Sequence, residues 1–116
     1  MEKKDILIVD DMEINRAILT QIFEDRNRIL EAENGLEAVK ILKERGENIA
    51  AVLLDILMPV MDGFQVMEKM QKMGLRDKIP VFLITADSSE ESMRRGYDLG
   101  AMDIIEKPIV PYFVRR

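Results

Sequence analysis

The chain has 116 residues, 47% of them hydrophobic and 34% charged, which is typical of one soluble globular domain. A formal net charge of −5 argues against sequence-independent nucleic-acid binding, and no apolar run suits a signal peptide or a membrane span. The absence of cysteine and histidine excludes disulfides, thiol chemistry and histidine catalysis or ligation. Any metal must be held by oxygen, which favours magnesium, manganese or calcium, and a cysteine-free chain fits a reducing cytoplasm.

Short aliphatic runs alternate with segments of helical periodicity along the whole chain. The aliphatic runs predict strands over residues 5–9, 29–32, 50–54, 81–84 and 103–106. The segments between them predict helices over 13–25, 36–45, 62–73 and 88–99, followed by the start of a short fifth helix over 111–116. Ser88 and Glu91 have the spacing of a capping box, which predicts that Ser88 begins the fourth helix.

Strands that are apolar on both faces and alternate with helices indicate a parallel sheet covered on both sides. Right-handed crossovers then give an α/β fold with a doubly wound five-stranded parallel sheet flanked by five helices. No linker or repeat interrupts the pattern, so residues 1–116 are expected to form a single domain. Ligands of such folds bind at the carboxyl ends of the strands. The polar residues expected to meet there are Asp10, Asp11, Asp55, Thr85 and Lys107.

Three of these residues are carboxylates that follow two strands. A carboxylate such as Asp55, at the end of a buried strand, is costly to desolvate unless it has a partner or a chemical task. Together with Asp10 and Asp11 it suggests a divalent-cation site in which Asp55 is a candidate nucleophile. Less specific interpretations also fit: the acid pair could cap the next helix, Thr85 could be an ordinary β-branched residue, and Lys107 could be a solvated charge.

The order and spacing of these motifs resemble the receiver domain of two-component response regulators. The matching segments are Val9-Asp10-Asp11, Leu54-Asp55 with Met58-Pro59 and Asp62-Gly63, Thr85-Ala86, and Gly100-Ala101 followed by Lys107-Pro108. The resemblance extends from about residue 5 to the end of the chain. It implies the CheY-like, flavodoxin-like strand order 2-1-3-4-5 and a cis peptide bond between Lys107 and Pro108.

The resemblance also implies a phosphorelay signalling domain that catalyses only its own phosphorylation and dephosphorylation. Asp55 would accept a phosphoryl group from a phosphohistidine of a sensor histidine kinase or a phosphotransfer domain. Mg²⁺, or Mn²⁺ in its place, would be bound directly by Asp11, Asp55 and the backbone carbonyl of Leu57, and by Asp10 through water. The phosphoryl oxygens would be contacted by the Thr85 hydroxyl and the Lys107 ammonium.

The chemistry of an aspartate nucleophile suits the residues that are available. A carboxylate that is ionised at neutral pH needs no general base, so the absence of histidine is no obstacle. Phosphoryl transfer requires positive charge against the phosphoryl oxygens. Mg²⁺ can bind through one or two carboxylates while it keeps several waters, and Lys107 adds a compact positive charge.

Two side chains depart from the family's usual pattern. Ile104 stands three residues before the lysine, where an aromatic side chain often changes rotamer on phosphorylation, so the switch is expected to be muted or differently routed. Leu57 stands where a polar side chain is common, and it cannot orient a hydrolytic water. Asp87 could supply a polar contact instead, so the direction of the effect on the phosphoryl lifetime stays open.

The last predicted helix is shorter than is usual in the family. This suggests a receiver excised or truncated from a longer response regulator with an unidentified C-terminal output domain; a natural lone receiver is the alternative. A homodimer would use the face made by the fourth helix, fifth strand and fifth helix.

Three other functions fit the sequence less well. A magnesium-dependent phosphatase with an aspartyl-phosphate intermediate typically carries a second acid two residues after the nucleophile, where this chain has Leu57. A flavin-binding module would need a phosphate-cradling loop after the first strand, and none is visible. A degenerate receiver used only for docking is disfavoured because the polar set is complete.

Overall fold

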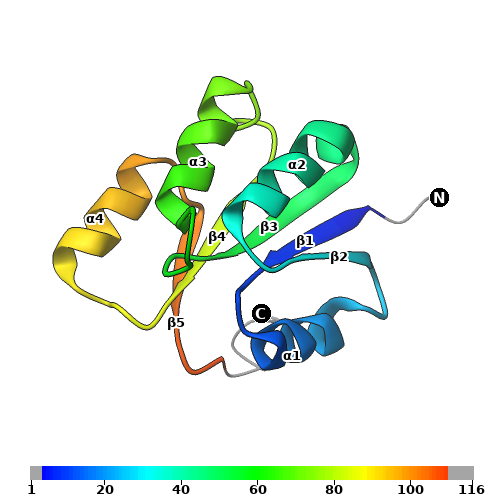
Figure 1. Cartoon of the computed structure of the whole chain (residues 1–116), viewed down its shortest axis with the longest axis horizontal. Helices are drawn as coiled ribbons and strands as arrows, with labels where there is room; N and C mark the ends of the chain where they lie inside the picture. Colours follow the sequence, from blue (N-terminus) through cyan, green and yellow to red (C-terminus); the bar gives the residue numbers. More distant parts are fainter. Residues whose placement is uncertain (1–3, 110–116) are drawn as a thin grey trace.

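Residues 4–109 are described by a computed structural model, in which five parallel strands form one sheet (Figure 1). The strands are β1 (Asp5–Val9), β2 (Arg28–Ala32), β3 (Ile49–Asp55), β4 (Val81–Thr85) and β5 (Asp103–Glu106). Their order is β2-β1-β3-β4-β5, and every neighbouring pair is parallel. Both the strand order and the parallel pairing confirm the prediction.

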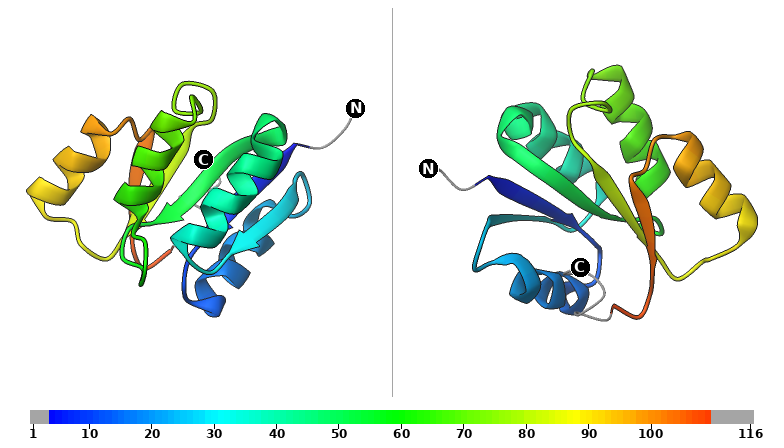
Figure 2. Two further views of the ribbon diagram at one scale, coloured as in Figure 1. Left: turned by 45° about the horizontal axis from the view of Figure 1, so that its top comes forward. Right: turned by 180° about the vertical axis from the view of Figure 1, so that it is seen from behind.

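Within the described range, four α-helices connect the strands. They are α1 (Glu13–Phe23), α2 (Gly35–Arg45), α3 (Gly63–Lys72) and α4 (Glu90–Asp98), with a 3-10 turn, η1 (Gly46–Asn48), after α2. Figures 1 and 2 show α2, α3 and α4 on one face of the sheet and α1 on the other. The fifth helix predicted over 111–116 lies outside the described residues, so the predicted number of helices is not confirmed.

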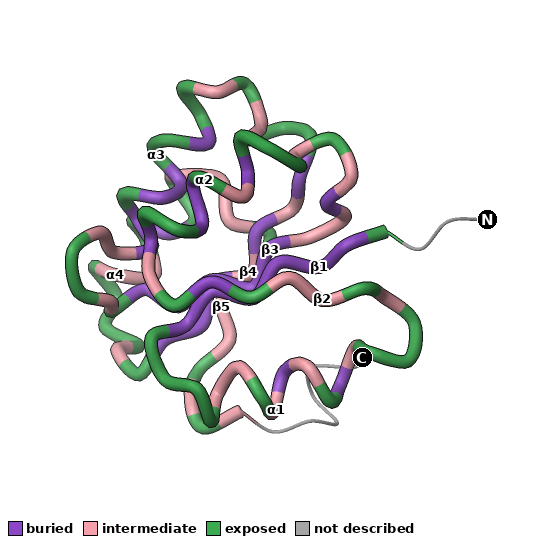
Figure 3. The backbone as a smooth tube through the Cα atoms, turned by 45° about the vertical axis from the view of Figure 1, so that its right-hand side comes forward, coloured by how far each residue is buried: buried purple, intermediate pink, exposed green. Residues whose placement is uncertain are grey.

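The sheet is buried in its centre because its middle strands are apolar on both faces. Leu7 and Val9 of β1 belong to the core beneath α2, α3 and α4, whereas Ile6 and Ile8 belong to the core beneath α1. This alternation is the two-residue period of a strand. Figure 3 shows the buried residues concentrated along the central strands. A sheet covered on both faces therefore supports the residues at its carboxyl edge.

The helix starts follow local capping, with one correction to the prediction. Asp62 caps α3 through a capping box, since its Oδ1 accepts from the Gln65 amide at 2.9 Å and Gln65 Oε1 accepts from the Asp62 amide at 2.9 Å. The N-cap of α4 is Ser89, not Ser88 as predicted. Asp87 Oδ1 accepts from the Ser89 amide at 2.9 Å, so the turn closed by Asp87 includes position 88 and the helix begins after it.

The peptide bond between Lys107 and Pro108 is cis, as the resemblance implied. No helix in residues 4–109 is both long enough and apolar enough to cross a membrane.

Candidate functional site

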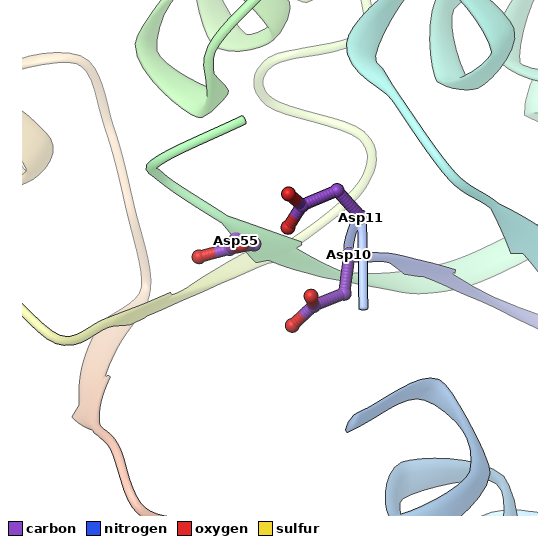
Figure 4. A group of neighbouring side chains, drawn as sticks. All are labelled: Asp10, Asp11 and Asp55. Atoms are coloured by element: carbon purple, nitrogen blue, oxygen red, sulfur yellow. The ribbon is translucent and has the colours of Figure 1, made fainter. Parts of the chain in front are cut away.

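The neighbouring ends of β1 and β3 bring three carboxylates together. Val9 is paired with Leu54, so Asp10 follows β1 beside Asp55, the last residue of β3. Figure 4 shows the side chains of Asp10, Asp11 and Asp55 at these strand ends, with their carboxylates turned to the same side. One oxygen of each carboxylate lies within 4.8 Å of one oxygen of the others. The structure thus gathers the three acids that the sequence placed at two strand ends.

Burial makes this cluster electrostatically demanding. Asp10 is 1% exposed and Asp55 is 2% exposed, whereas Asp11 is exposed. The Oδ2 atoms of Asp10 and Asp55 are buried without a hydrogen-bond partner. A carboxylate oxygen that is buried without a hydrogen bond is costly, and three like charges so close repel one another. A hard divalent cation fits this arrangement because its preferred ligands are carboxylate oxygens and its charge offsets theirs.

Lys107 supplies the positive side chain at this edge. Its Nζ lies 3.3 Å from Asp55 Oδ1 and 3.4 Å from Asp10 Oδ2. Its backbone amide donates to the Thr85 carbonyl at 2.8 Å, which continues the pairing of β4 with β5 and fixes where the side chain starts. The ammonium group therefore contacts both buried carboxylates. Lys107 follows β5, on the side of β3 that is opposite to β1 and Asp10.

The pKa of Asp55 is raised to about 6 from an ordinary value of 3.8. Burial is the main cause, because it disfavours the charged carboxylate, and the negative charge of Asp10 adds to it. The Lys107 ammonium acts in the opposite direction. Asp55 is consequently still mostly ionised at pH 7, as an aspartate nucleophile requires.

Thr85 is fully buried at the end of β4, and its hydroxyl is engaged with Asp87. Thr85 Oγ1 accepts from the Asp87 amide at 2.8 Å and donates to the Asp87 carbonyl at 3.0 Å. The Asp87 carboxylate in turn accepts from the Ser89 amide and, at 2.8 Å, from the Ser92 hydroxyl. Both carboxylate oxygens of Asp87 therefore stabilise the start of α4, and the polar contact suggested for Asp87 at the site stays a prediction.

The two unusual positions, Leu57 and Ile104, lie in different surroundings. Leu57 is 59% exposed in the loop after β3, and metal binding by its carbonyl stays a prediction. Ile104 packs beneath α4, where a Cβ atom on Gly96 would lie 3.0 Å from Ile104 Cδ1 and 2.7 Å from Leu83 Cδ1. The glycine lets α4 approach the sheet closely, so Ile104 lies under the helix as an aliphatic packing residue.

Comparison of the sequence with known proteins identifies related chains. A family model described as the response regulator receiver domain matches residues 6–112. The transcriptional regulatory protein SrrA of Staphylococcus aureus is 38% identical over 108 residues, which are 92% of this chain and 43% of that protein. A probable cyclic di-GMP phosphodiesterase of Vibrio cholerae is 38% identical over 104 residues, 90% of this chain and 23% of that protein. The chain spans less than half the length of these relatives.

Solved structures share nearly the whole fold. A chain in the CheX–CheY–BeF3–Mg complex from Borrelia burgdorferi has a TM-score of 0.89 and 34% identity, covering 96% of this chain and 83% of that chain. A chain in the complex of the Saccharomyces cerevisiae histidine phosphotransfer protein Ypd1 with the receiver domain of Ssk1 has a TM-score of 0.85 and 25% identity, covering 97% and 83%.

Proposed function

Because the chain belongs to the family of response regulator receiver domains, and is thus a phosphoacceptor domain of two-component signalling, we propose that Asp55 is the residue that becomes phosphorylated. The observation that carries this proposal is the state of the Asp55 carboxylate. It is buried at the end of β3, one oxygen faces Lys107 Nζ at 3.3 Å, and the other has no hydrogen-bond partner. This carboxylate is ionised, oriented and incompletely satisfied, which suits a nucleophile.

The proposed reaction moves one phosphoryl group. An oxygen of the Asp55 carboxylate attacks the phosphorus of a phosphohistidine, and the new O–P bond forms as the P–N bond breaks and its electron pair leaves with the imidazole. Lys107, already at Asp55, contacts a phosphoryl oxygen. The Thr85 hydroxyl donates to another oxygen after it releases the Asp87 carbonyl. Asp10, Asp11, Asp55 and the Leu57 carbonyl would hold Mg²⁺ or Mn²⁺, which supplies further positive charge when bound.

The proposed phosphodonor is a sensor histidine kinase or a histidine phosphotransfer domain. The solved complex of a histidine phosphotransfer protein with a receiver of this fold supports this class of partner. Exposed apolar side chains also lie next to the acids in the chain, namely Met12 and Ile14 at the start of α1 and Leu57 and Val60 after β3. Such side chains beside a charged site suit contact with another protein.

We further propose that phosphorylation switches an output domain or a partner, inside the cytoplasm. The curated relatives are much longer than the segment they share with this chain and are named for different outputs, a transcriptional regulator and a phosphodiesterase. A homodimer through α4 and β5 would use the exposed side chains of Tyr97 and Met102. Family membership disfavours the phosphatase alternative, since receiver domains are signalling domains and not enzymes acting on separate phosphate esters.

Intact-mass measurement with a small phosphodonor tests the phosphorylation site. The protein is incubated with acetyl phosphate and Mg²⁺, and we expect the mass of one phosphoryl group to be gained. Asp55→Asn should abolish the gain, whereas Asp62→Asn, a change in the cap of α3, should retain it. Equal uptake by Asp55→Asn and the unaltered protein would overturn the assignment.

A further inference from the structure

Arg16 of α1 contacts both the backbone that follows β1 and a side chain of β2. Its Nη1 donates to the backbone carbonyl of Asp10 at 2.7 Å, and its Nε pairs with Glu31 Oε1 at 3.1 Å. The Arg16 side chain is only 14% exposed. An enclosed guanidinium with two directed contacts is fixed in position, unlike a solvated surface arginine.

The carbonyl that Arg16 contacts lies where the backbone leaves β1. The Asp10 amide still donates to the Ala32 carbonyl at 3.1 Å, so it continues the pairing of β1 with β2. The Asp10 carbonyl belongs to the next peptide, the one that joins Asp10 to Asp11, where the backbone leaves the sheet. On the other side of this peptide, the Met12 amide donates to Asp10 Oδ1 at 2.9 Å. The orientation of this peptide sets the directions of two of the three clustered carboxylates.

We propose that Arg16 is a positioning residue of the metal site: its guanidinium, oriented by Glu31, holds the Asp10–Asp11 peptide so that both carboxylates meet Asp55 as a divalent cation requires. This inference rests on the proposed function of the site. Groups that orient metal ligands typically change metal affinity by about 10–100-fold when they are removed. Arg16 acts on the ligands through the backbone and touches none of the three carboxylate groups in the contacts above.

The two contacts of Arg16, with the Asp10 carbonyl and with Glu31, depend on the shape of the guanidinium as well as on its charge. Arg16 lies in a shallow hollow that it shares with Glu13, Glu31, Glu33 and Glu37. A lysine at position 16 would keep the positive charge among these acids. It would lack the planar fork that lets one side chain contact a carbonyl and a carboxylate in fixed directions. Arg16→Lys therefore separates the two contributions.

Titration calorimetry with Mg²⁺ on the whole chain tests the proposal. We expect Arg16→Met to weaken Mg²⁺ binding at least about 10-fold. Arg16→Lys should also weaken Mg²⁺ binding. Glu31→Gln should weaken Mg²⁺ binding less than Arg16→Met does, because the contact of Arg16 with the Asp10 carbonyl remains. Arg94→Met is the matched control, since Arg94 pairs with Glu90 on the exposed face of α4. It should leave Mg²⁺ affinity unchanged.

A merely structural role for Arg16 makes a different prediction. It would lower the free energy of unfolding while the folded variants kept the original Mg²⁺ affinity, and that result would overturn the proposal. Amide hydrogen exchange without metal gives an independent measurement: Arg16→Met should speed exchange selectively at Met12, whose amide donates to Asp10 Oδ1. Phosphoryl uptake at saturating Mg²⁺ is measured in parallel. If the unaltered protein is phosphorylated but Arg16→Met binds Mg²⁺ normally, only this inference fails; if the unaltered protein binds no Mg²⁺, both proposals fail.

Discussion

The Thr85 hydroxyl is closed onto the backbone of Asp87, from whose amide it accepts a hydrogen bond and to whose carbonyl it donates one. The same Asp87 stabilises the start of α4 through Ser89 and Ser92. A hydroxyl has one proton to donate, so the proposed bond from Thr85 to a phosphoryl oxygen would replace its bond to the Asp87 carbonyl. This chain of contacts leads from the site to α4 without passing through Ile104.

The first prediction concerns this connection. Thr85→Ala should still accept a phosphoryl group on Asp55, but phosphorylation should no longer change amide hydrogen exchange over residues 87–93. The reason is that the hydroxyl that exchanges partners is absent. The measurement is hydrogen exchange by mass spectrometry with and without acetyl phosphate. Ser88→Ala, in an exposed position of the same turn, serves as the control and should retain the response. An unchanged response in Thr85→Ala would contradict the prediction.

The second prediction follows from the raised pKa of Asp55. The folded state holds a proton on this carboxyl between pH 3.8 and about 6, where the unfolded state has released it. Stability of the metal-free protein therefore falls as pH rises through that window, by up to about 3 kcal/mol for this group. Asp55→Asn carries no such penalty and should be more stable than the unaltered protein at pH 7, with the difference shrinking toward pH 4. Urea unfolding without divalent cations measures it; a pH-independent difference would be evidence against this explanation.

The third prediction concerns Asp5, at the opposite end of β1. Its buried carboxylate accepts from Arg28 Nε at 2.7 Å and from Arg28 Nη2 at 3.3 Å, and Arg45 Nη1 lies 3.9 Å away. The hydrogen bonds from Arg28 are the main reason that the pKa of Asp5 is lowered. The unfolded state thus binds a proton on Asp5 more readily than the folded state does. The stabilisation from the ionised Asp5 is complete above the ordinary pKa of aspartate, and it is lost as pH falls through the lower pKa of the folded state.

Asp5→Asn should accordingly lower the free energy of unfolding at pH 7 by about 1–3 kcal/mol, because a charge-assisted pair is replaced by a neutral amide. The loss should diminish in acid. Mg²⁺ affinity should not change, since Asp5 lies at the far end of the strand from the acids. A change in Mg²⁺ binding larger than the error of the titration would show that the two ends of β1 are coupled.

The fourth prediction uses Gly63 at the start of α3. A Cβ atom there would lie 2.5 Å from the Asp55 carbonyl oxygen and 2.9 Å from Ile56 Cα, both of which are backbone atoms. Gly63→Ala should therefore displace the end of β3, lower stability by about 1–3 kcal/mol and slow phosphoryl uptake. In Gly46→Ala the new methyl group would meet only the flexible side chain of Leu75, at 3.3 Å, so uptake should stay normal. Thermal unfolding and the rate of mass gain are compared for both variants.

Local pattern was enough to predict the strands, most helix bounds and the edge at which the polar residues gather. The aliphatic runs are short and are separated by helical periodicity, and the side chains after a parallel strand emerge at one edge whatever the details of packing. The strand order and the cis bond before Pro108 needed the family resemblance as well. The start of α4 was predicted one residue early, although Asp87, two residues before Ser89, offered a local signal for the turn.

By itself, the sequence determined which residues would reach the carboxyl edge, because the ends of strands are encoded locally. Only the tertiary structure decided what each residue meets there. The unsatisfied oxygen of Asp55, the position of Lys107 between two carboxylates and the reach of Arg16 to the Asp10 carbonyl all depend on contacts between separate elements. Such contacts are set by how α1 packs on the sheet and by where β3 and β5 stand within it, and no spacing along the chain specifies those distances.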